Sequence, residues 1–462
     1  MRLKINLKLY VIIFLFYHFF SGYVYCFSLN DLLLENIFNV EITDFRYIIA
    51  DTNLAVTKTV LPEPQKNKKF CFIDMKSKTK LFGEKKFSEL EKYYSQCLET
   101  RLDYDSRHNM TSFIWLIYKD IKNAAELSAD WQKEFPKSHL PHLLNACLSI
   151  DKAWEARGTG WASSVTEEGW KEMNRYLIVG LDELKTAYEL NPADPNIGAV
   201  GVIVTMGMDC NLASAKAWFN RAMNADPYHV SAYMQMMNIL WPKWGGSYEL
   251  AKSVVDDALT KTDFNPQLFA ALPLYYEEYC ERLSDSDENP KWKRKTEYKK
   301  IYDSILKKKY EKAAKKYPDE YQIRARYGMD ALEQKDRELG LKQLELAIEL
   351  IESGKSVDFP YFSSYNCSIY SIFNKYAWIL STSKNEKHYN PERALIYAKK
   401  TVELAPEWVW GIDTLANAYA AIGDFKTAIE TQTKAMQYGN ETFQRTSRKK
   451  ISNFEKGIAP RY

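Results

Sequence analysis

The chain has 462 residues, of which 46% are hydrophobic and 27% are charged, the composition of a folded, soluble protein rather than a disordered one. Its formal net charge of +3 is too small to indicate nucleic-acid binding, so we expect no nucleic-acid partner. Aromatic residues make up 14%, and we interpret most of these rings as packing between helices rather than as a ligand site.

The N-terminus, residues 1–28, has the pattern of an export signal. Basic residues precede an apolar block, residues 9–20, which is short for a membrane span of about 20 residues. We expect cleavage after Cys26 or Ser28 and an exported protein, either periplasmic or extracellular. The alternative is a membrane anchor over residues 9–27, because further apolar residues follow the block.

Residues 29–82 carry short strand-like runs that Pro62, Pro64 and a polar stretch interrupt, and we expect a small irregular cap. Seven cysteines are spread over the chain without a Cys-x-x-Cys pair. A large helical core does not depend on disulfides, so we interpret the cysteines as buried apolar residues. Disulfides are the alternative, which an oxidising compartment would permit.

From residue 83 onward the pattern is helical, and prolines punctuate it at intervals. We expect each proline to lie just inside the start of a helix, where a missing N–H has no energetic cost. The positions are Pro136, Pro192, Pro227, Pro266, Pro318, Pro360 and Pro406.

The helices before these prolines carry two small residues seven positions apart. Seven residues are close to two helical turns, so both residues lie on one face, and a small side chain there lets the next helix approach closely. The pairs are Gly180/Ala187, Ala215/Ala222, Ala251/Ala258, Gly340/Ala347 and Ala428/Ala435, with Ala394/Thr401 as a weaker sixth.

Two strings in the middle of the chain combine Trp, Gly and a cation. Residues 153–161 read AWEARGTGW and residues 241–247 read WPKWGGS. Together with EFPKS at residues 134–138, they resemble an exported bacterial family of unknown function with repeat-like helices. The resemblance spans roughly Phe82 to Leu259 and implies a helical architecture and a bacterial source, but no substrate.

These strings allow two interpretations. Gly, Pro and Trp are the residues that structural joints use, so both strings would end helices and fill gaps with aromatic rings. Alternatively, a set of cations and rings would line one pocket for an anionic or glycan group. That set is Arg157, Trp161, Trp170, Lys243 and Trp244.

Other charged and metal-binding residue types give weaker signals. His139 and His142 are three residues apart without a third ligand nearby, so we expect no metal site. We interpret Glu277 and Glu278 as surface charge, because adjacent carboxylates on a helix point in different directions. The basic run 291–316 predicts a helix with a solvated lysine face, and weak contact with anionic lipid headgroups is the alternative.

The clearest pattern is a helical hairpin from Pro406 to Met436. Apolar residues recur at helical spacing over 412–419, Gly423 and Asp424 supply a turn, and the spacing resumes over 425–435. This segment resembles the tetratricopeptide repeat, whose period is about 34 residues. Residues 374–406 resemble a second unit, but their loop at 381–390 is longer than the usual turn.

The resemblance implies an all-α, right-handed superhelical solenoid of degenerate tetratricopeptide-like hairpins, preceded by the small cap. One such hairpin cannot bury both of its faces alone, so it needs neighbours of the same kind. We divide the helical part into a repeat-like domain at 83–265, linker repeats with the basic helix at 266–360, and C-terminal repeats at 361–458.

The resemblance also implies a non-catalytic scaffold, without a cofactor, that captures a peptide or protein in its concave groove. The candidate groove residues share the face away from Leu415 and Tyr419; they are Trp410, Asp413, Asn417 and Ala421. The alternative is a helical toroid that acts on glycans of the cell envelope, either as an enzyme or as a binding protein. Such an enzyme needs two carboxylates that face each other across a cleft.

Overall fold

Every regular element that the structure describes is a helix, and the described ranges contain no strand. The structure is a computed structural model that describes residues 75–99, 110–111, 113–119, 121–160, 162–208, 211–283, 291–353 and 368–462. The all-α prediction is confirmed. The predicted export signal and most of the predicted irregular cap lie outside these residues, whereas residues 75–83 form helix α4.

The chain divides into two compact units, and the division falls within helix α14. Unit 1 includes Met75–Leu102 and Phe113–Tyr275, and unit 2 includes Tyr276–Tyr462. The α-helices up to the division are α4 (Met75–Gly83), α5 (Phe87–Glu99), α7 (Ala124–Glu134), α8 (Leu140–Arg157), α9 (Glu167–Leu190), α10 (Pro195–Met208), α11 (Leu212–Ala225), α12 (Val230–Ile239), α13 (Tyr248–Thr260) and α14 (Ala271–Leu283), with short 3-10 turns η1 (Ala162–Ser164), η2 (Pro242–Trp244) and η3 (Pro266–Ala270).

Unit 2 continues with a long basic helix and three helical hairpins. Its elements are α15 (Lys291–Ile301), the π-helical turn η4 (Tyr302–Leu306), α16 (Lys307–Lys316), α17 (Tyr321–Glu333), α18 (Arg337–Glu352), α19 (Ile369–Thr382), the 3-10 turn η6 (Glu386–His388), α20 (Pro391–Leu404), α21 (Val409–Ala421), α22 (Phe425–Met436) and α23 (Glu441–Glu455).

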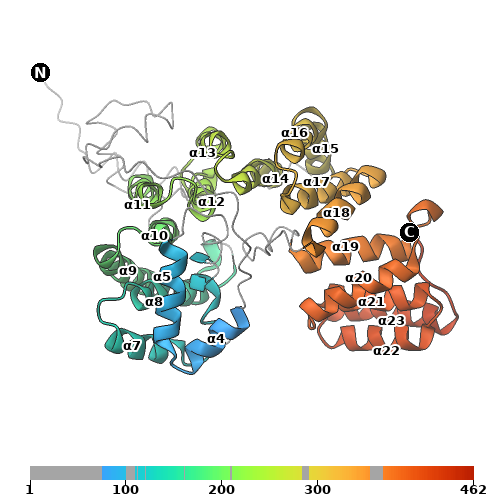
Figure 1. Ribbon diagram of the computed structural model, residues 1–462, viewed down its shortest axis with the longest axis horizontal. Coiled ribbons are helices and arrows are strands. Elements are labelled where there is room, and N and C mark those ends of the chain that lie inside the picture. Colours follow the sequence, from blue (N-terminus) through green and yellow to red (C-terminus); the bar gives the residue numbers. More distant parts are fainter. Residues whose placement is uncertain are drawn as a thin grey trace, which may run out of the picture. The chain divides into compact units, whose positions relative to one another are not determined.

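Helices pack in sequential pairs within each unit (Figure 1). In unit 1, α8 packs on α9, α10 on α11 and α12 on α13, and each pair also contacts the first helix of the next. In unit 2, α17 packs on α18, α19 on α20 and α21 on α22, while α23 covers α22. This arrangement confirms a solenoid of helical hairpins in each unit.

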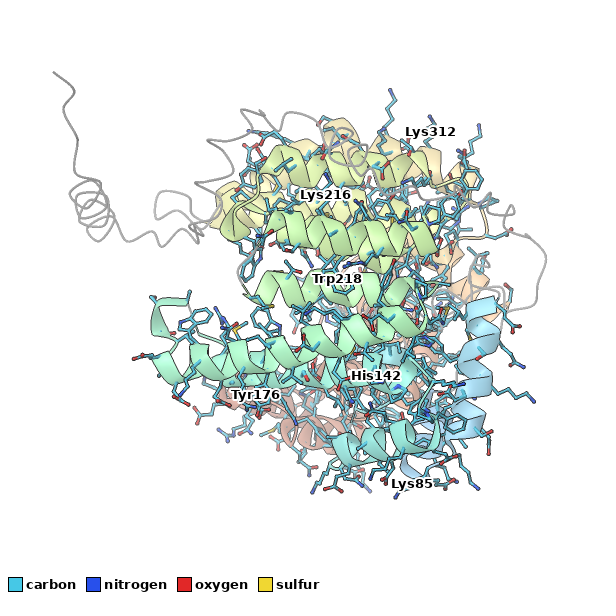
Figure 2. The ribbon with its side chains drawn as sticks, turned by 90° about the vertical axis from the view of Figure 1, so that its left-hand side faces the viewer. Lys85, His142, Tyr176, Lys216, Trp218 and Lys312 are labelled. Atoms are coloured by element: carbon cyan, nitrogen blue, oxygen red, sulfur yellow. The ribbon has the colours of Figure 1, made fainter. Side chains whose placement is uncertain are left out.

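Each predicted small residue is buried where two helices meet. Ala222 of α11 faces Gly198 of α10, and the ring of Trp218 packs over Gly201 of α10. Figure 2 shows α9, α10 and α11 as successive layers, with Trp218 labelled beside α10. A methyl group added at Gly340 would lie 2.5 Å from Leu332 Cγ, so α18 contacts α17 closely there. The full set is Gly180, Ala187, Ala215, Ala222, Ala251, Ala258, Gly340, Ala347, Ala394, Thr401, Ala428 and Ala435.

The prolines mark helix ends rather than helix starts, so our placement of most of them was wrong. Five of them lie two residues after the last residue of a helix, and the next helix begins three or four residues later. The physical reason is that a proline disfavours helical geometry in the residue before it and cannot continue the helix. These five are Pro136, Pro192, Pro227, Pro318 and Pro406; Pro266 does begin a 3-10 turn, and Pro360 lies outside the described residues.

The described cysteines fit the interpretation as buried apolar residues. Cys97, Cys147 and Cys280 are buried, and burial raises the pKa of the Cys147 thiol well above its ordinary value. Cys26, Cys71, Cys210 and Cys367 lie outside the described residues. Among the helices that the structure describes, none combines the length and the apolar composition that a membrane crossing requires.

Candidate functional site

The two Trp- and Gly-containing strings meet at one place in unit 1. The ring of Trp154 in α8 lies edge-on to that of Trp244 in η2, with centroids 6.5 Å apart. The Arg157 guanidinium lies 5.7 Å from the Trp154 ring centroid and 5.5 Å from that of Trp170. Lys243 Nζ lies 5.3 Å from the Trp244 ring. We call these five residues the cation–aromatic cluster.

Local backbone structure positions Arg157 and Trp170. Helix α8 ends at Arg157, and Gly158 follows with φ of 74°, a conformation that favours glycine. Arg157 Nη1 donates to the carbonyls of Gly158 and Gly160, at 3.1 and 3.0 Å, where a cation also suits the C-terminal end of the helix dipole. Thr166 caps α9 by accepting a bond from the Gly169 N–H, which places Trp170 in the first turn of α9.

The rest of the second string forms a structural joint. Trp241 is buried and stacks on Tyr275, with ring centroids 5.3 Å apart. Gly245 has φ of 86°, and a methyl group at Gly246 would lie 2.0 Å from the Leu240 carbonyl oxygen. The joint interpretation therefore describes these residues well, whereas Trp170 in the cluster keeps 41% of its surface exposed. Trp161, the remaining predicted member of the pocket, lies outside the described residues.

The second predicted set lies on α21, where the neighbouring helices cover most of it. Asp413 accepts bonds from Lys450 Nζ of α23 at 2.6 Å and from Gln432 Nε2 of α22 at 2.8 Å. Asn417 is buried, and its amide donates to Asp413 at 3.4 Å.

The other two members of this set lie nearer the ends of α21. Trp410 is 56% exposed, and its ring lies edge-on to that of Phe443 in α23. The Ala421 carbonyl accepts a bond from the Tyr389 hydroxyl at 3.1 Å. Of the four predicted groove residues, Trp410 presents the most exposed side chain.

His139 and His142 each pair with a carboxylate from another segment of unit 1. His139 Nε2 lies 3.0 Å from Asp194 Oδ2, which also accepts from the Tyr94 hydroxyl at 2.6 Å. His142 Nδ1 lies 2.6 Å from Glu183 Oε2. Burial opposes ionisation of Asp194, but the hydrogen bonds from His139 and Tyr94 outweigh it and hold its pKa below the ordinary value. The described residues contain no group of three metal-binding side chains.

Unit 2 contains a buried charge network that we did not predict. Arg326 of α17 pairs with Glu277 of α14 and lies 3.2 Å from Asp330 Oδ1. The hydroxyls of Tyr298 and Tyr310 donate to Asp330, at 3.0 and 2.6 Å. Partial burial raises the pKa of Glu277 to about 6, while 34% of its side chain stays exposed, so Glu277 is an ion-pair partner at the edge of this network rather than a fully solvated charge. The only sequence signal was Arg and Asp four residues apart on one helix.

The basic helix has a buried side and an exposed lysine face. Tyr298, Tyr302 and Tyr310 are buried, and Lys307 pairs with Asp336 at 3.2 Å. Lys312 of α16 projects from the molecular surface (Figure 2). A solvated face describes this geometry, and lipid contact stays a prediction.

Comparisons with known proteins give only distant structural likeness. No family model matches the chain, and no curated protein matches it. The yeast Tom70 crystal structure is 13% identical, covers 83% of this chain and 94% of its own, and has a TM-score of 0.32. The P58(IPK) TPR domain is 12% identical, with coverage of 83% and 99% and a TM-score of 0.23.

A complex of Naa15 and Naa10 bound to HypK-THB is 14% identical over 82% of this chain and 65% of the other, with a TM-score of 0.22. Scores at this level carry no argument about function. The solenoid assignment therefore depends on the sequential helix packing within the two units.

Proposed function

We propose that this chain is a helical-repeat scaffold that binds a segment of another protein, and that the cation–aromatic cluster of unit 1 contacts an acidic part of that segment. The observation that carries the proposal is the exposed Trp170 ring beside the Arg157 guanidinium. Trp and Arg are the residue types that most often dominate binding energy at protein interfaces. A ring held near a cation offers both apolar contact and charge to a partner.

The charge of the cluster favours an acidic partner. Arg157 and Lys243 contribute the two cations, and the bonds of Arg157 to the Gly158 and Gly160 carbonyls use one of its nitrogens. A guanidinium carries five N–H donors, so donors remain for a carboxylate of the partner. We also propose that the protein acts after export, and the support for this is the sequence pattern of residues 1–28.

The test compares three immobilised proteins: the unaltered chain, Trp170→Ala and Val179→Ala. Val179 is a matched control, because it also lies on α9 and is 44% exposed. It is nine residues from Trp170, which places it on the opposite face of the helix. Proteins retained from an extract of the source cells are identified by mass spectrometry. We expect a partner that the unaltered chain and Val179→Ala retain and that Trp170→Ala loses, with equal melting temperatures.

Two results would contradict this proposal. The same proteins on all three baits would show that the cluster does not contribute to binding. If the unaltered chain and Val179→Ala retain a polysaccharide and Trp170→Ala does not, the glycan-binding alternative is favoured.

A further inference from the structure

The long loop between α19 and α20 holds the last residues of the sequence in unit 2. The Tyr462 N–H donates to the Thr382 carbonyl, and the Lys384 N–H donates to the Tyr462 carbonyl at 3.1 Å. Tyr462 thus makes two backbone bonds, one to the end of α19 and one to the loop, in the pattern that an added strand makes when a peptide binds to a sheet edge. The loop is the one whose length departs from the usual repeat turn.

The Arg461 side chain contacts three different groups, which together form a binding site for it. Its Nε donates to the Ser383 carbonyl at 2.7 Å, and its Nη2 pairs with Glu386 Oε1 at 2.6 Å. Its guanidinium lies 3.6 Å from the centre of the Tyr389 ring. A carbonyl, a carboxylate and an aromatic face together match a guanidinium better than an ammonium, because only the guanidinium is planar and donates in several directions.

The Tyr462 ring stacks on Trp378 of α19, with centroids 6.1 Å apart and planes 19° from parallel. The same Tyr462 is 56% exposed, so its docking buries little apolar surface. Directional contacts to the backbone, the Arg side chain and one ring therefore hold this segment. Such contacts are typical of peptide recognition rather than of core packing.

We propose that Trp378–Tyr389 is a docking site for an extended peptide that carries Arg followed by an aromatic residue, and that Arg461–Tyr462 occupies this site within the same chain. This inference depends on the proposed function as a binder of protein segments. A tethered segment competes at an effective concentration on the order of millimolar, so a partner carrying the same pattern binds fully only when the chain's own segment leaves.

The test first removes the chain's own segment with the double substitution Arg461→Glu and Tyr462→Ala. A fluorescent peptide of residues 457–462 (GIAPRY), with an amidated C-terminus, is then titrated and followed by anisotropy. We expect this peptide to bind the double variant at least about tenfold more tightly than it binds the unaltered chain. The peptide GIAPEY should not bind the double variant.

A charge exchange controls for the fold and for the identity of the site. Glu386 is 80% exposed at its side chain and pairs with Arg461, so Glu386→Arg should fold normally while it repels the chain's own segment. We expect this variant to reject GIAPRY, because two guanidinium groups would then face each other at the site. It should reject GIAPEY as well, because the Ser383 carbonyl and the Tyr389 ring, which the substitution leaves in place, favour a cation.

Three results would overturn the proposal. If the double variant folds but does not bind GIAPRY, residues 461–462 only stabilise the fold and the site does not recognise peptides. If the unaltered chain binds GIAPRY as tightly as the double variant does, the peptide binds at a different site. If the unaltered chain is a dimer and the double variant is a monomer, the segment exchanges between two copies of the chain. The variants of this test lie in unit 2, so its failure is distinguishable from a failure at the unit 1 cluster.

Discussion

Gly198 and Gly207 both lie on α10, but an added methyl group would meet different neighbours at the two positions. At Gly198 the new Cβ would lie 2.5 Å from the backbone N of Ala222 and 2.6 Å from the Trp218 carbonyl oxygen. At Gly207 it would lie 2.8 Å from Leu177 Cδ1, the end of a flexible side chain. We predict that Gly198→Ala destabilises unit 1 and that Gly207→Ala does not.

The difference follows from what can move. Both substitutions gain about 1 kcal/mol, because alanine favours the helix more than glycine does. At Gly198 ordinary contact begins at 3.4 Å, so α10 and α11 must separate by about 0.9 Å (3.4 − 2.5). Overpacking costs about 1–3 kcal/mol, and a backbone obstacle places the cost at the upper end. The net loss is about 2 kcal/mol, or a fall of about 4–8 °C in the melting temperature.

The assay is thermal unfolding followed by circular dichroism, with hydrogen exchange of α10 and α11 to assign the transition to unit 1. Gly207→Ala should melt within about 2 °C of the unaltered chain, because the propensity gain offsets a small movement of Leu177. Equal melting temperatures for the two variants would refute the claim that small residues set the distance between these helices.

Three further predictions concern other parts of the chain. Asp413→Ala should destabilise α21–α23 by about 1–3 kcal/mol, because it removes the acceptor of Lys450 and one of the two acceptors of Gln432; hydrogen exchange in these helices measures the loss. Folding lowers the pKa of Asp194, so its stabilising contribution is present above the unfolded value of about 4 and is lost as the pH falls through the folded pKa. Acid unfolding of Asp194→Asn should therefore depend less on pH in that range. Anionic vesicles should bind the chain through the lysine face of α16 at low salt and release it at high salt, as co-sedimentation measures.

The repeat positions could be predicted because the required information is local. Two small residues seven apart specify a close contact whatever the identity of the next helix, as Ala222 against Gly198 shows. The turn at Gly423 and Asp424 is equally local: Gly423 has φ of 88°, and Asp424 accepts a bond from the Thr427 N–H at 3.1 Å. Proline was misplaced because one residue type marks both helix starts and helix ends.

The partners of charged residues could not be predicted, because they come from distant parts of the chain. Asp413 fits a groove position by its spacing on α21, yet Lys450 lies 37 residues further along and covers it. Arg461 lies 75 residues from Glu386. A periodic pattern shows which face of a helix is polar, but not which other helix or segment lies against that face.

Both candidate sites occur where the repeat is interrupted, and the packing of the hairpins gives a reason. A regular repeat uses its small residues and apolar faces to contact its neighbours, so packing determines the side chains on those faces. The break after α8 leaves Arg157 and Trp170 at the surface, and the extended loop after α19 leaves backbone groups and Trp378 for a peptide. Departures from the repeat pattern are therefore where binding residues should be sought in degenerate arrays of this kind, because hairpin stacking does not determine the side chains at those positions.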